Sequence, residues 1–137
     1  MENNINYNIV ILGGGQAAAH AATTIRQEDE SSSLAIITNE NYLPYERPPL
    51  SKSFLLNKVN ESDFIFYNED HYKNLNIDIL KNEEVINIDF EKKLLESKNK
   101  KITYTKLLIA TGCKNRTLDL ENVNSDDVYY LRDINES

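Results

Sequence analysis

Three consecutive glycines, Gly13-Gly14-Gly15, separate an apolar run from an alanine-rich stretch, and this junction restricts the possible folds more than any other segment. The apolar run covers residues 9–12 and the alanine-rich stretch residues 16–22. The chain of 137 residues has only four glycines, whereas an average composition would give about nine or ten. A strand, a glycine turn and a helix in this order predict a dinucleotide-binding turn, here with the pattern Gly13-x-Gly15-x-x-Ala18.

Each position of this turn has its own physical role in the prediction. Gly13 would let the chain leave the strand at a backbone angle that side chains disfavour, and Gly15 would leave room for a pyrophosphate to touch the backbone. Ala18, in the place of the third glycine, would let the helix pack closely on the strand. A helix over residues 16–26 would direct its free N–H groups and positive dipole end at the phosphates. The alternative is a glycine turn that only joins a strand to a helix.

The rest of the chain predicts further elements of an α/β domain. A short apolar run at 34–38 suits a buried parallel strand, and with strand 7–12 and the helix it forms a βαβ unit. The elements expected after it are a helix with Ser51 as its N-cap and residues 54–56 as its apolar face, a weaker helix at 69–75, strands at 77–80 and 85–88, a polar β-excursion at 92–104, and a buried strand at 107–110.

Composition and charge restrict the class of protein. Hydrophobic residues make up 40% and charged residues 27%, as in an ordinary globular domain, and no stretch approaches the roughly 18 consecutive apolar residues of a membrane span. The net charge of −7 argues against affinity for nucleic acid or anionic membranes. The polar first residues do not resemble a signal peptide, so a cytoplasmic location is expected. Cys113 is the only cysteine, which excludes an internal disulfide, and no residue cluster has metal-ligand spacing.

Polar residues after the second expected strand are candidates for ribose binding. In a dinucleotide fold, an acid about 20 residues past the glycine motif usually binds a ribose hydroxyl. Glu40 has this chemistry, and Asn39 at the strand tip can also hydrogen-bond a hydroxyl. The alternative is that both are ordinary exposed loop residues.

A proline-rich loop carries the second group of candidates. Residues 43–52, which we call the proline loop, contain all three prolines of the chain, and prolines fix backbone angles. Arg47, held extended before Pro48, could pair with a phosphate in forked geometry. Lys52 could point toward the same ligand. The alternative is a surface loop with two ordinary cations.

Three segments together resemble those of one protein family: residues 9–19, residues 44–52 (PYERPPLSK) and residues 107–112 (LLIATG). With these segments the chain resembles the N-terminal FAD-binding segment of FAD-dependent, NADH-using reductases of the putidaredoxin and rhodocoxin reductase type. Monodehydroascorbate reductase and apoptosis-inducing factor, of the same pyridine nucleotide-disulfide oxidoreductase superfamily, are similar in the same places. The resemblance covers residues 5–135 and implies a Rossmann-like FAD/NAD(P)-binding α/β fold, a parallel sheet with a β-meander excursion.

The resemblance also implies a set of cofactor-binding residues, and it assigns no catalytic residue to this chain. Asn39 stands where the family usually has an acid for the adenosine ribose, with Glu40 beside it. Lys52 would lie by the flavin ring, where a cation can stabilise negative charge on reduced flavin. The other implied roles are as follows. The FAD pyrophosphate would be bound by Gly13, Gly14, Gly15, Gln16 and Ala17, and the diphosphate region by Arg47. The adenine would contact the backbone of Val85, the chain would pass close to the cofactor at Ala110 and Gly112, and Arg132 would lie near the flavin.

The activity implied by the resemblance passes a hydride from NAD(P)H to FAD and then electrons to a ferredoxin-like or other acceptor. In the family, an NADH-binding domain is inserted after the first FAD-binding segment, and the chain later returns to complete the FAD domain. Residues 1–137 correspond to that first segment, with an incomplete fold and no second glycine motif. We therefore expect that this chain alone is not a competent reductase. The alternatives are a stand-alone nucleotide-binding module and an inactive remnant.

Overall fold

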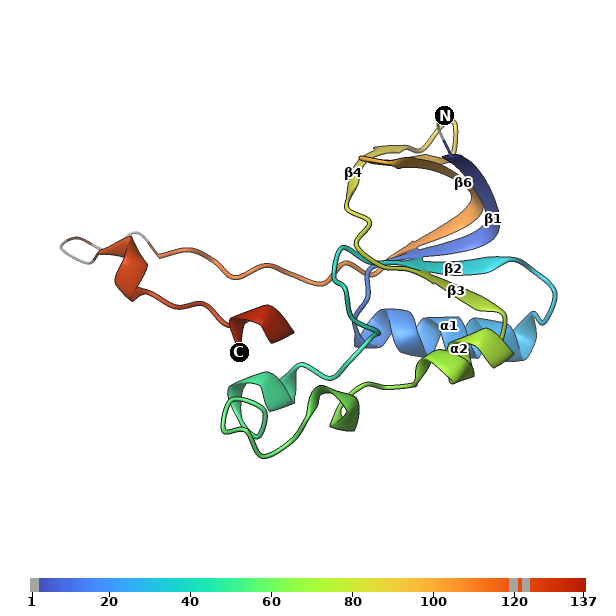
Figure 1. The fold of residues 1–137 in the computed structure, drawn as a ribbon. Coiled ribbons are helices and arrows are strands. Elements are labelled where there is room, and N and C mark those ends of the chain that lie inside the picture. The colour runs from blue at the N-terminus through green and yellow to red at the C-terminus, as the bar shows by residue number, and fades with distance from the viewer. Residues whose placement is uncertain (1–2, 119–120, 122–123) are drawn as a thin grey trace.

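The protein forms a mixed six-stranded sheet with helices on one face, in a computed structural model that describes residues 3–118, 121 and 124–137 (Figure 1). The strand order is β3-β2-β1-β6-β5-β4, in which β3, β2, β1 and β6 are parallel neighbours and β5 runs antiparallel to β4 and β6. The strands are β1 (Asn3–Leu12), β2 (Leu34–Ile37), β3 (Ile77–Leu80), β4 (Val85–Asp89), β5 (Leu94–Ser97) and β6 (Lys100–Ile109). The helices are α1 (Gln16–Glu28) and α2 (Glu69–Asn74), with short 3₁₀ turns η1 (Pro48–Ser51), η2 (Glu61–Asp63), η3 (Ser125–Asp127) and η4 (Ile134–Glu136).

The central strands are covered on both faces, which explains their continuous apolar sequence. Ile11 of β1 packs with Ala18 and Ala22 of α1 on the helix side. Its neighbour Val10 packs on the other side with Leu95 and Ile102, which the antiparallel strands β5 and β6 contribute. Because successive side chains of β1 point to opposite faces and both faces are covered, β1 is held in the middle of the sheet. The glycine turn that follows β1 therefore lies at the centre of the sheet's edge.

Strand β1 is longer than its apolar run predicts. Its polar beginning, from Asn3, pairs in parallel with β6 in a register that matches Asn3 to Lys100 and Leu12 to Ile109. This long-range pairing extends the strand where local composition does not favour one. At the other end, Ala110 N–H donates to the Leu12 carbonyl over 2.7 Å, and Gly13 N–H donates to the Ile37 carbonyl over 2.8 Å. The ends of β1, β2 and β6 therefore meet around the glycine turn.

Ser51 does not cap a helix, contrary to the sequence prediction. It is the last residue of η1, and the chain continues through turns to Asn57, whose φ is +52°. Leu55 and Leu56 are exposed, while Phe54 packs edge-on against Phe64. The chain folds back here because this packing joins Phe54 to the cluster that surrounds Tyr45.

The expectation of a buried strand at 107–110 is also wrong in part. These residues belong to β6 up to Ile109, but the side chains of Leu108 and Ile109 are 40% and 51% exposed. Helices α1 and α2 pack mainly against β1, β2 and β3, which leaves the end of β6 less covered.

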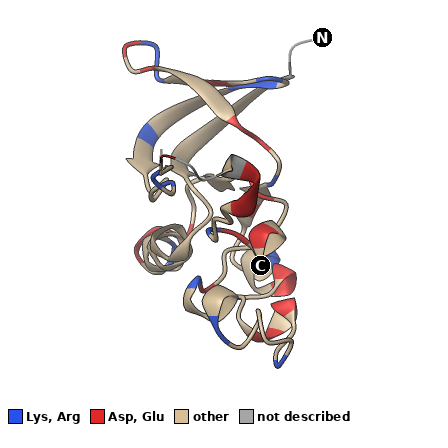
Figure 2. Cartoon of the chain, turned by 90° about the vertical axis from the view of Figure 1, so that its left-hand side faces the viewer, with Lys and Arg blue, Asp and Glu red and all other residues tan. Residues whose placement is uncertain are grey.

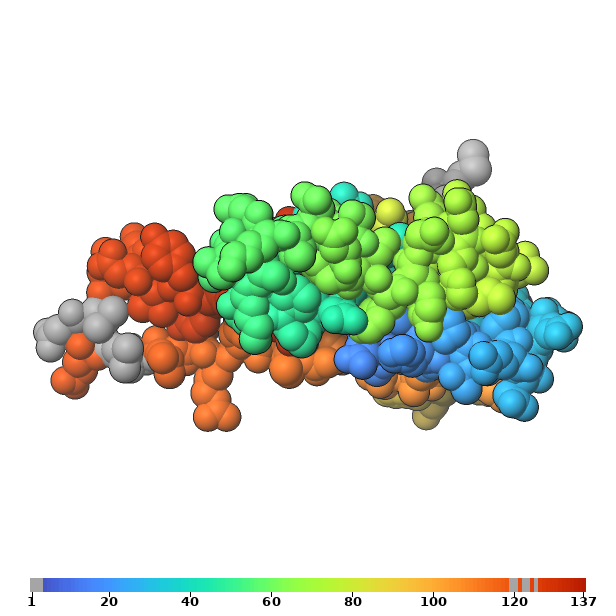
Figure 3. Space-filling model, turned by 90° about the horizontal axis from the view of Figure 1, so that it is seen from below, coloured from blue at the N-terminus to red at the C-terminus, as the bar shows by residue number. Residues whose placement is uncertain are grey.

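Residues 124–137, which we call the C-terminal arm, return to the proline loop after the chain has left the sheet (Figure 1). Leu131 and Ile134 pack on the cluster of Tyr45, Leu50 and Phe64. Three hydrogen bonds hold the contact: Tyr42 Oη, just before the loop, donates to Asn135 Oδ1 (2.8 Å), Arg47 donates to the Arg132 carbonyl (2.6 Å), and Ser137 Oγ donates to the Leu50 carbonyl (2.6 Å). Figure 3 shows the arm beside this part of the chain from below. None of the described helices is long and apolar enough to cross a membrane.

Candidate functional site

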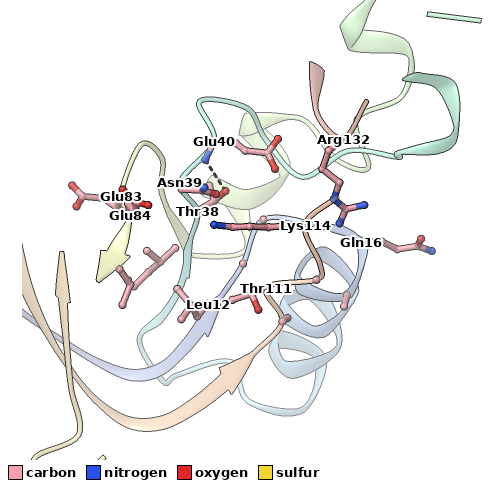
Figure 4. Close-up of a pocket in the computed structure, with 18 of the residues that line it drawn as sticks. Leu12, Gln16, Thr38, Asn39, Glu40, Glu83, Glu84, Thr111, Lys114 and Arg132 are labelled. Carbon is pink, nitrogen blue, oxygen red and sulfur yellow. Dashed lines mark hydrogen bonds between the residues drawn. The ribbon is translucent and has the colours of Figure 1, made fainter. Parts of the chain in front are cut away.

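A pocket of about 480 Å³ opens where the carboxyl ends of β1, β2 and β6 meet (Figure 4). In open α/β sheets with parallel strands, ligands bind at this edge. The pocket is lined by Leu12, Gly13, Gly14, Gly15, Gln16, Ala17, Ile37, Thr38, Asn39, Glu40, Arg47, Glu83, Glu84, Val85, Ala110, Thr111, Gly112, Lys114 and Arg132.

The three glycines of the turn differ in what surrounds them. Gly13 has φ +124°, and a Cβ added to it would lie 2.1 Å from the Ala110 carbonyl oxygen. A Cβ on Gly14 would lie 2.4 Å from Thr38 Oγ1. A Cβ on Gly15 would meet no atom within 4 Å. The first two glycines therefore allow the strand ends to approach, and the third leaves open space against the backbone, as a pyrophosphate requires.

The N-terminus of α1 has free hydrogen-bond donors at this open space. Gly15 is the N-cap, no side chain caps the helix, and its first turn has no acid. Ala19 N–H bonds the Gly15 carbonyl over 3.1 Å, so the N–H groups before Ala19 have no α-helical acceptor. Gln16 and Ala17 line the pocket. Uncapped donors at the positive end of a helix form a site suited to an anion.

Each acid of the pocket is paired with a cation. Glu40 pairs with Arg47, Glu83 with Lys100, and Glu84 with Lys98 at 3.6 Å. Burial opposes the ionisation of Glu83, but hydrogen bonds from Lys100 and Ser97 and the charge of Lys100 outweigh it, so its pKa lies below the usual range.

Two cations of the pocket, Lys114 and Arg132, have no carboxylate within ion-pair distance in the part of the chain that the structure describes. Their side chains extend into the pocket from the segment after β6 and from the C-terminal arm (Figure 4). Figure 2 shows basic and acidic residues interspersed along the chain. With a net charge of −7 for the chain, this pocket is a local site of unpaired positive charge, which suits an anionic ligand.

Arg47 connects the proline loop to Glu40, just after β2, and to the C-terminal arm. Its guanidinium pairs with Glu40 and donates to Tyr45 Oη over 2.8 Å and to the Arg132 carbonyl over 2.6 Å. Tyr45 Oη donates to the second Glu40 oxygen over 2.6 Å. Burial, together with this hydrogen bond, raises the pKa of Tyr45 far above its usual value, so the phenol stays a donor. Because both Glu40 oxygens accept hydrogen bonds here, Asn39 is the freer ribose candidate.

The pocket brings together every sequence-predicted site residue except Lys52. The Lys52 side chain is exposed, and its Nζ lies 3.4 Å from the Pro48 carbonyl and 3.3 Å from Ser51 Oγ. The roles of all these residues toward a cofactor stay predictions.

Five polar pocket residues were not anticipated from the sequence: Thr38, Glu83, Glu84, Thr111 and Lys114. The rule that parallel strands end at one edge could have indicated Thr38 and Thr111, which directly follow a strand or its last apolar residues. Glu83 and Glu84 precede β4, opposite the tip of β2, where Glu83 N–H bonds the Thr38 carbonyl over 2.9 Å. Lys114 had no local signal, because its place depends on how the chain crosses the pocket after β6.

The histidines and the cysteine lie outside this pocket. The His20 ring packs on Phe66 and the His71 ring stacks on Tyr67, with centroids 5.2 and 4.2 Å apart. Cys113 is exposed. Within residues 3–118, 121 and 124–137, no three His, Cys, Asp or Glu side chains are arranged to hold a metal ion.

Comparison with known proteins gives one consistent result. A family model described as pyridine nucleotide-disulphide oxidoreductase matches residues 7–137. The chain is 36% identical to a rubredoxin-NAD(+) reductase of Pseudomonas putida over 105 residues, which is 76% of this chain and 27% of the relative. It is 31% identical over 131 residues to a rhodocoxin reductase of Rhodococcus erythropolis, which is 95% of this chain and 31% of that protein.

A solved structure agrees with these relatives. NADH:rubredoxin oxidoreductase from Clostridium acetobutylicum superposes with a TM-score of 0.85 at 30% identity, covering 96% of this chain and 34% of the other. The Rossmann-like fold expected from the sequence is thereby confirmed, as is the resemblance to this group of reductases. The chain spans between a quarter and about a third of the length of the proteins it matches.

Proposed function

Because this chain belongs to the pyridine nucleotide-disulphide oxidoreductase family, we propose that it is the FAD-binding portion of an oxidoreductase. The enzyme passes electrons from NAD(P)H through FAD to a ferredoxin-like or other acceptor. The observation that carries the proposal is the pocket at the ends of β1, β2 and β6, where free helix N–H groups and unpaired cations face open space. Bound FAD supplies the redox chemistry, since the flavin exchanges both hydrides and single electrons.

The residues of this chain bind and orient the pyrophosphate. The N–H groups of Gln16 and Ala17, at the uncapped N-terminus of α1, would donate hydrogen bonds to its oxygens, and the open space at Gly15 would let it approach the backbone. Arg132, whose carbonyl accepts a hydrogen bond from Arg47, also lines the pocket, and its guanidinium would lie near the flavin, as the resemblance implies.

The end of the pocket nearest β2 and β4 would hold the adenosine half. Asn39, just after β2, and Val85 both line the pocket; Asn39 would bind the ribose, and the backbone at Val85 would contact the adenine. Lys52 does not line the pocket and lies exposed in the proline loop, where it would contact the flavin half. The proposal thus divides the cofactor between a preformed adenosine diphosphate pocket and a more open flavin end.

The acceptor and the location are part of the same proposal. Rubredoxin and rhodocoxin appear in the names of the relatives, which supports a small iron–sulfur protein as acceptor. The single exposed cysteine is compatible with a reducing, cytoplasmic compartment. The negative net charge disfavours nucleic acid as a partner.

A fluorescence titration tests the proposal. FAD is added to the purified chain and flavin emission is followed, with riboflavin as a ligand that lacks the adenosine diphosphate half. We expect saturable binding of FAD, little binding of riboflavin, and competition by ADP. Gly15→Val should weaken FAD binding by about tenfold or more, because its side chain fills the pyrophosphate space. Failure of a folded chain to bind either FAD or ADP would refute the proposal, and equal affinity for both would favour a plain adenine-nucleotide module.

A further inference from the structure

We infer that Lys114 is a further cofactor-binding residue: its ammonium donates a hydrogen bond to a ribose hydroxyl of the adenosine half, and Asn39 accepts the hydrogen bond that the same hydroxyl donates. The inference rests on the proposed function, because it concerns recognition within the same pocket. In dinucleotide folds, an acid at the end of the second strand usually hydrogen-bonds the ribose. This chain has the neutral Asn39 at that place, and the side chain of Lys114 extends toward it.

Lys114 enters the pocket from the segment after β6. Its side chain extends toward Thr38 and Asn39, which follow β2 (Figure 4), and all three residues line the pocket. Among the described residues, the ammonium of Lys114 has no hydrogen-bonding or ion-pair partner. A lysine ammonium has three N–H donors, so these donors are available to a ligand that binds beside Asn39.

Asn39 is the side chain at this strand end that a ligand can reach. Thr38 is buried, and its Oγ1 already accepts a hydrogen bond from the Glu40 N–H over 3.2 Å. The side chain of Asn39 is exposed. Its amide has an acceptor oxygen, which can take the hydrogen of a ribose hydroxyl as the oxygen of an acid would.

The two side chains together match the hydrogen-bonding capacity of a hydroxyl. A hydroxyl donates one hydrogen bond and can accept two, whereas an ionised carboxylate can only accept. Asn39 supplies the acceptor and Lys114 the donor, so both the hydrogen and the oxygen of the ribose hydroxyl find a partner. A hydrogen bond from a charged donor is stronger than one between neutral groups. Lys114 therefore offsets the weaker acceptor that Asn39 provides in place of an acid.

The surrounding charges favour a neutral hydroxyl over a phosphate at this place. The acids that line the pocket itself are paired with cations. A cavity of about 390 Å³ adjoins the pocket at Asn39 and Lys114, and it is also lined by Asp133 and Glu136. These two acids accept main-chain N–H bonds and have no cation partner among the described residues. They would repel a phosphorylated ribose, which agrees with FAD, because its adenosine ribose has free hydroxyls.

Calorimetric titrations of the purified chain with ADP and with 2′,3′-dideoxy-ADP test the inference. Both ligands have the adenine and the diphosphate, and the second lacks the two ribose hydroxyls. The ratio of their dissociation constants therefore isolates the contribution of those hydroxyls. We expect the unmodified chain to bind ADP about tenfold more tightly, which corresponds to about 1.4 kcal/mol.

Substitution of Lys114 should reduce this ratio. Lys114→Met removes the donor, and we expect the ratio to fall to about threefold, because Asn39 still contributes. Adding Asn39→Ala to that variant should bring the ratio to about one. Lys106→Met is the matched control: it removes the same charge from an exposed position of β6 outside the pocket and should keep the parental ratio. Lys114 is itself exposed, so the fold should persist, as circular dichroism can verify.

The outcomes separate the inference from the proposed function. If the unmodified chain binds ADP and 2′,3′-dideoxy-ADP equally well, the ribose hydroxyls are not recognised; the inference is then wrong, while the FAD proposal stands. If Lys114→Met weakens both ligands by the same factor, Lys114 acts on the diphosphate and its assignment to the ribose is wrong. If the chain binds neither FAD nor ADP, the proposed function fails together with the inference.

Discussion

Gly13 and Ala110 approach each other backbone to backbone: a Cβ added to Gly13 would lie 2.1 Å from the Ala110 carbonyl oxygen. The contact joins the start of the glycine turn to the end of β6, two points 97 residues apart in the chain. It brings the strand ends close enough to form one wall of the pocket, so this glycine is needed for the fold that creates the pocket.

Gly13→Ala should destabilise the fold severely. A φ of +124° is unfavourable for alanine, and the new methyl group would displace the end of β6. Together these effects should lower the free energy of unfolding by about 3 kcal/mol or more. Urea unfolding followed by far-UV circular dichroism measures the change. Gly15→Ala is the matched control: it should stay within about 1 kcal/mol of the parent, because its Cβ meets no atom within 4 Å. Equal losses at the two positions would contradict the assignment of separate roles.

The ion pair of Glu83 and Lys100 should make stability depend on pH. The pKa of Glu83 is lowered in the folded state, because the Lys100 and Ser97 contacts outweigh burial, which acts to raise it. The pair therefore contributes stability above the pKa of an unfolded glutamate, and this is lost as the pH falls through the lower folded pKa. Urea midpoints between pH 7 and pH 3 should fall less steeply in Glu83→Gln than in the parent. Glu84→Gln, at an exposed pair, should keep the parental slope.

Replacing Lys100, the cation of that pair, should lower the free energy of unfolding more than replacing a surface lysine. Lys100→Met leaves the Glu83 carboxylate charged and largely buried, with only 7% of its side chain exposed. We expect a loss of about 2 kcal/mol at pH 7, below the range for fully buried pairs because Lys100 itself is partly exposed. Lys98→Met should change the free energy of unfolding by less than about 0.5 kcal/mol. Equal effects at the two lysines would show that the Glu83 pair is no stronger than a surface contact.

Arg47→Lys should behave almost like Arg47→Ala. The guanidinium contacts Glu40, Tyr45 Oη and the Arg132 carbonyl at once, and a lysine ammonium cannot reproduce that fork. Both variants should free the C-terminal arm, seen as faster amide hydrogen exchange over residues 131–137, and both should weaken FAD binding. Tyr42→Phe removes only one peripheral hydrogen bond to the arm and serves as the control. If Arg47→Lys fully retained the protection of these amides from exchange, the forked contacts of the guanidinium would not be what holds the arm.

Lys52→Ala should separate the two halves of the cofactor site. Because Lys52 does not line the pocket, ADP affinity should stay unchanged. If Lys52 contacts the flavin half, FAD affinity should fall by about threefold to tenfold in the same variant. Parallel FAD and ADP titrations measure this difference. A drop in ADP affinity would place Lys52 at the diphosphate instead.

Much of this architecture could be predicted because it follows from local sequence patterns. The apolar runs before the glycine turn and at residues 34–37 became β1 and β2, and the alanine-rich stretch became α1. Because the carboxyl ends of parallel strands meet at one edge, Gly15 and Asn39 could be predicted to lie in one pocket without information on side-chain contacts. The β-excursion was also confirmed, as β5 and the start of β6.

The errors and omissions lie where distant segments determine the structure. The polar beginning of β1 is a strand because it pairs with β6, and Ser51 is not a helix cap because Phe54 turns back onto Phe64. Lys114 was missed for the same reason: in the pocket it lies beside Thr38 and Asn39, which follow β2 and are far away in the sequence. Hydrophobic periodicity predicts one helix or strand at a time, whereas each of these three features depends on a contact between two distant segments.

The C-terminal arm has a consequence for the order of folding. Three hydrogen bonds and the packing of Leu131 and Ile134 hold the arm to residues 42–50, whereas β1 and β6 are joined by a ladder that runs from the pair Asn3–Lys100 to the pair Leu12–Ile109, so the arm is the less strongly held of the two. The sheet and its helices can therefore assemble while Arg132 is still away from the pocket. Stopped-flow mixing of the refolding chain with FAD would then show a binding phase that is slower than sheet formation. We therefore predict that the arm influences both the rate at which FAD binds and the time for which it stays bound.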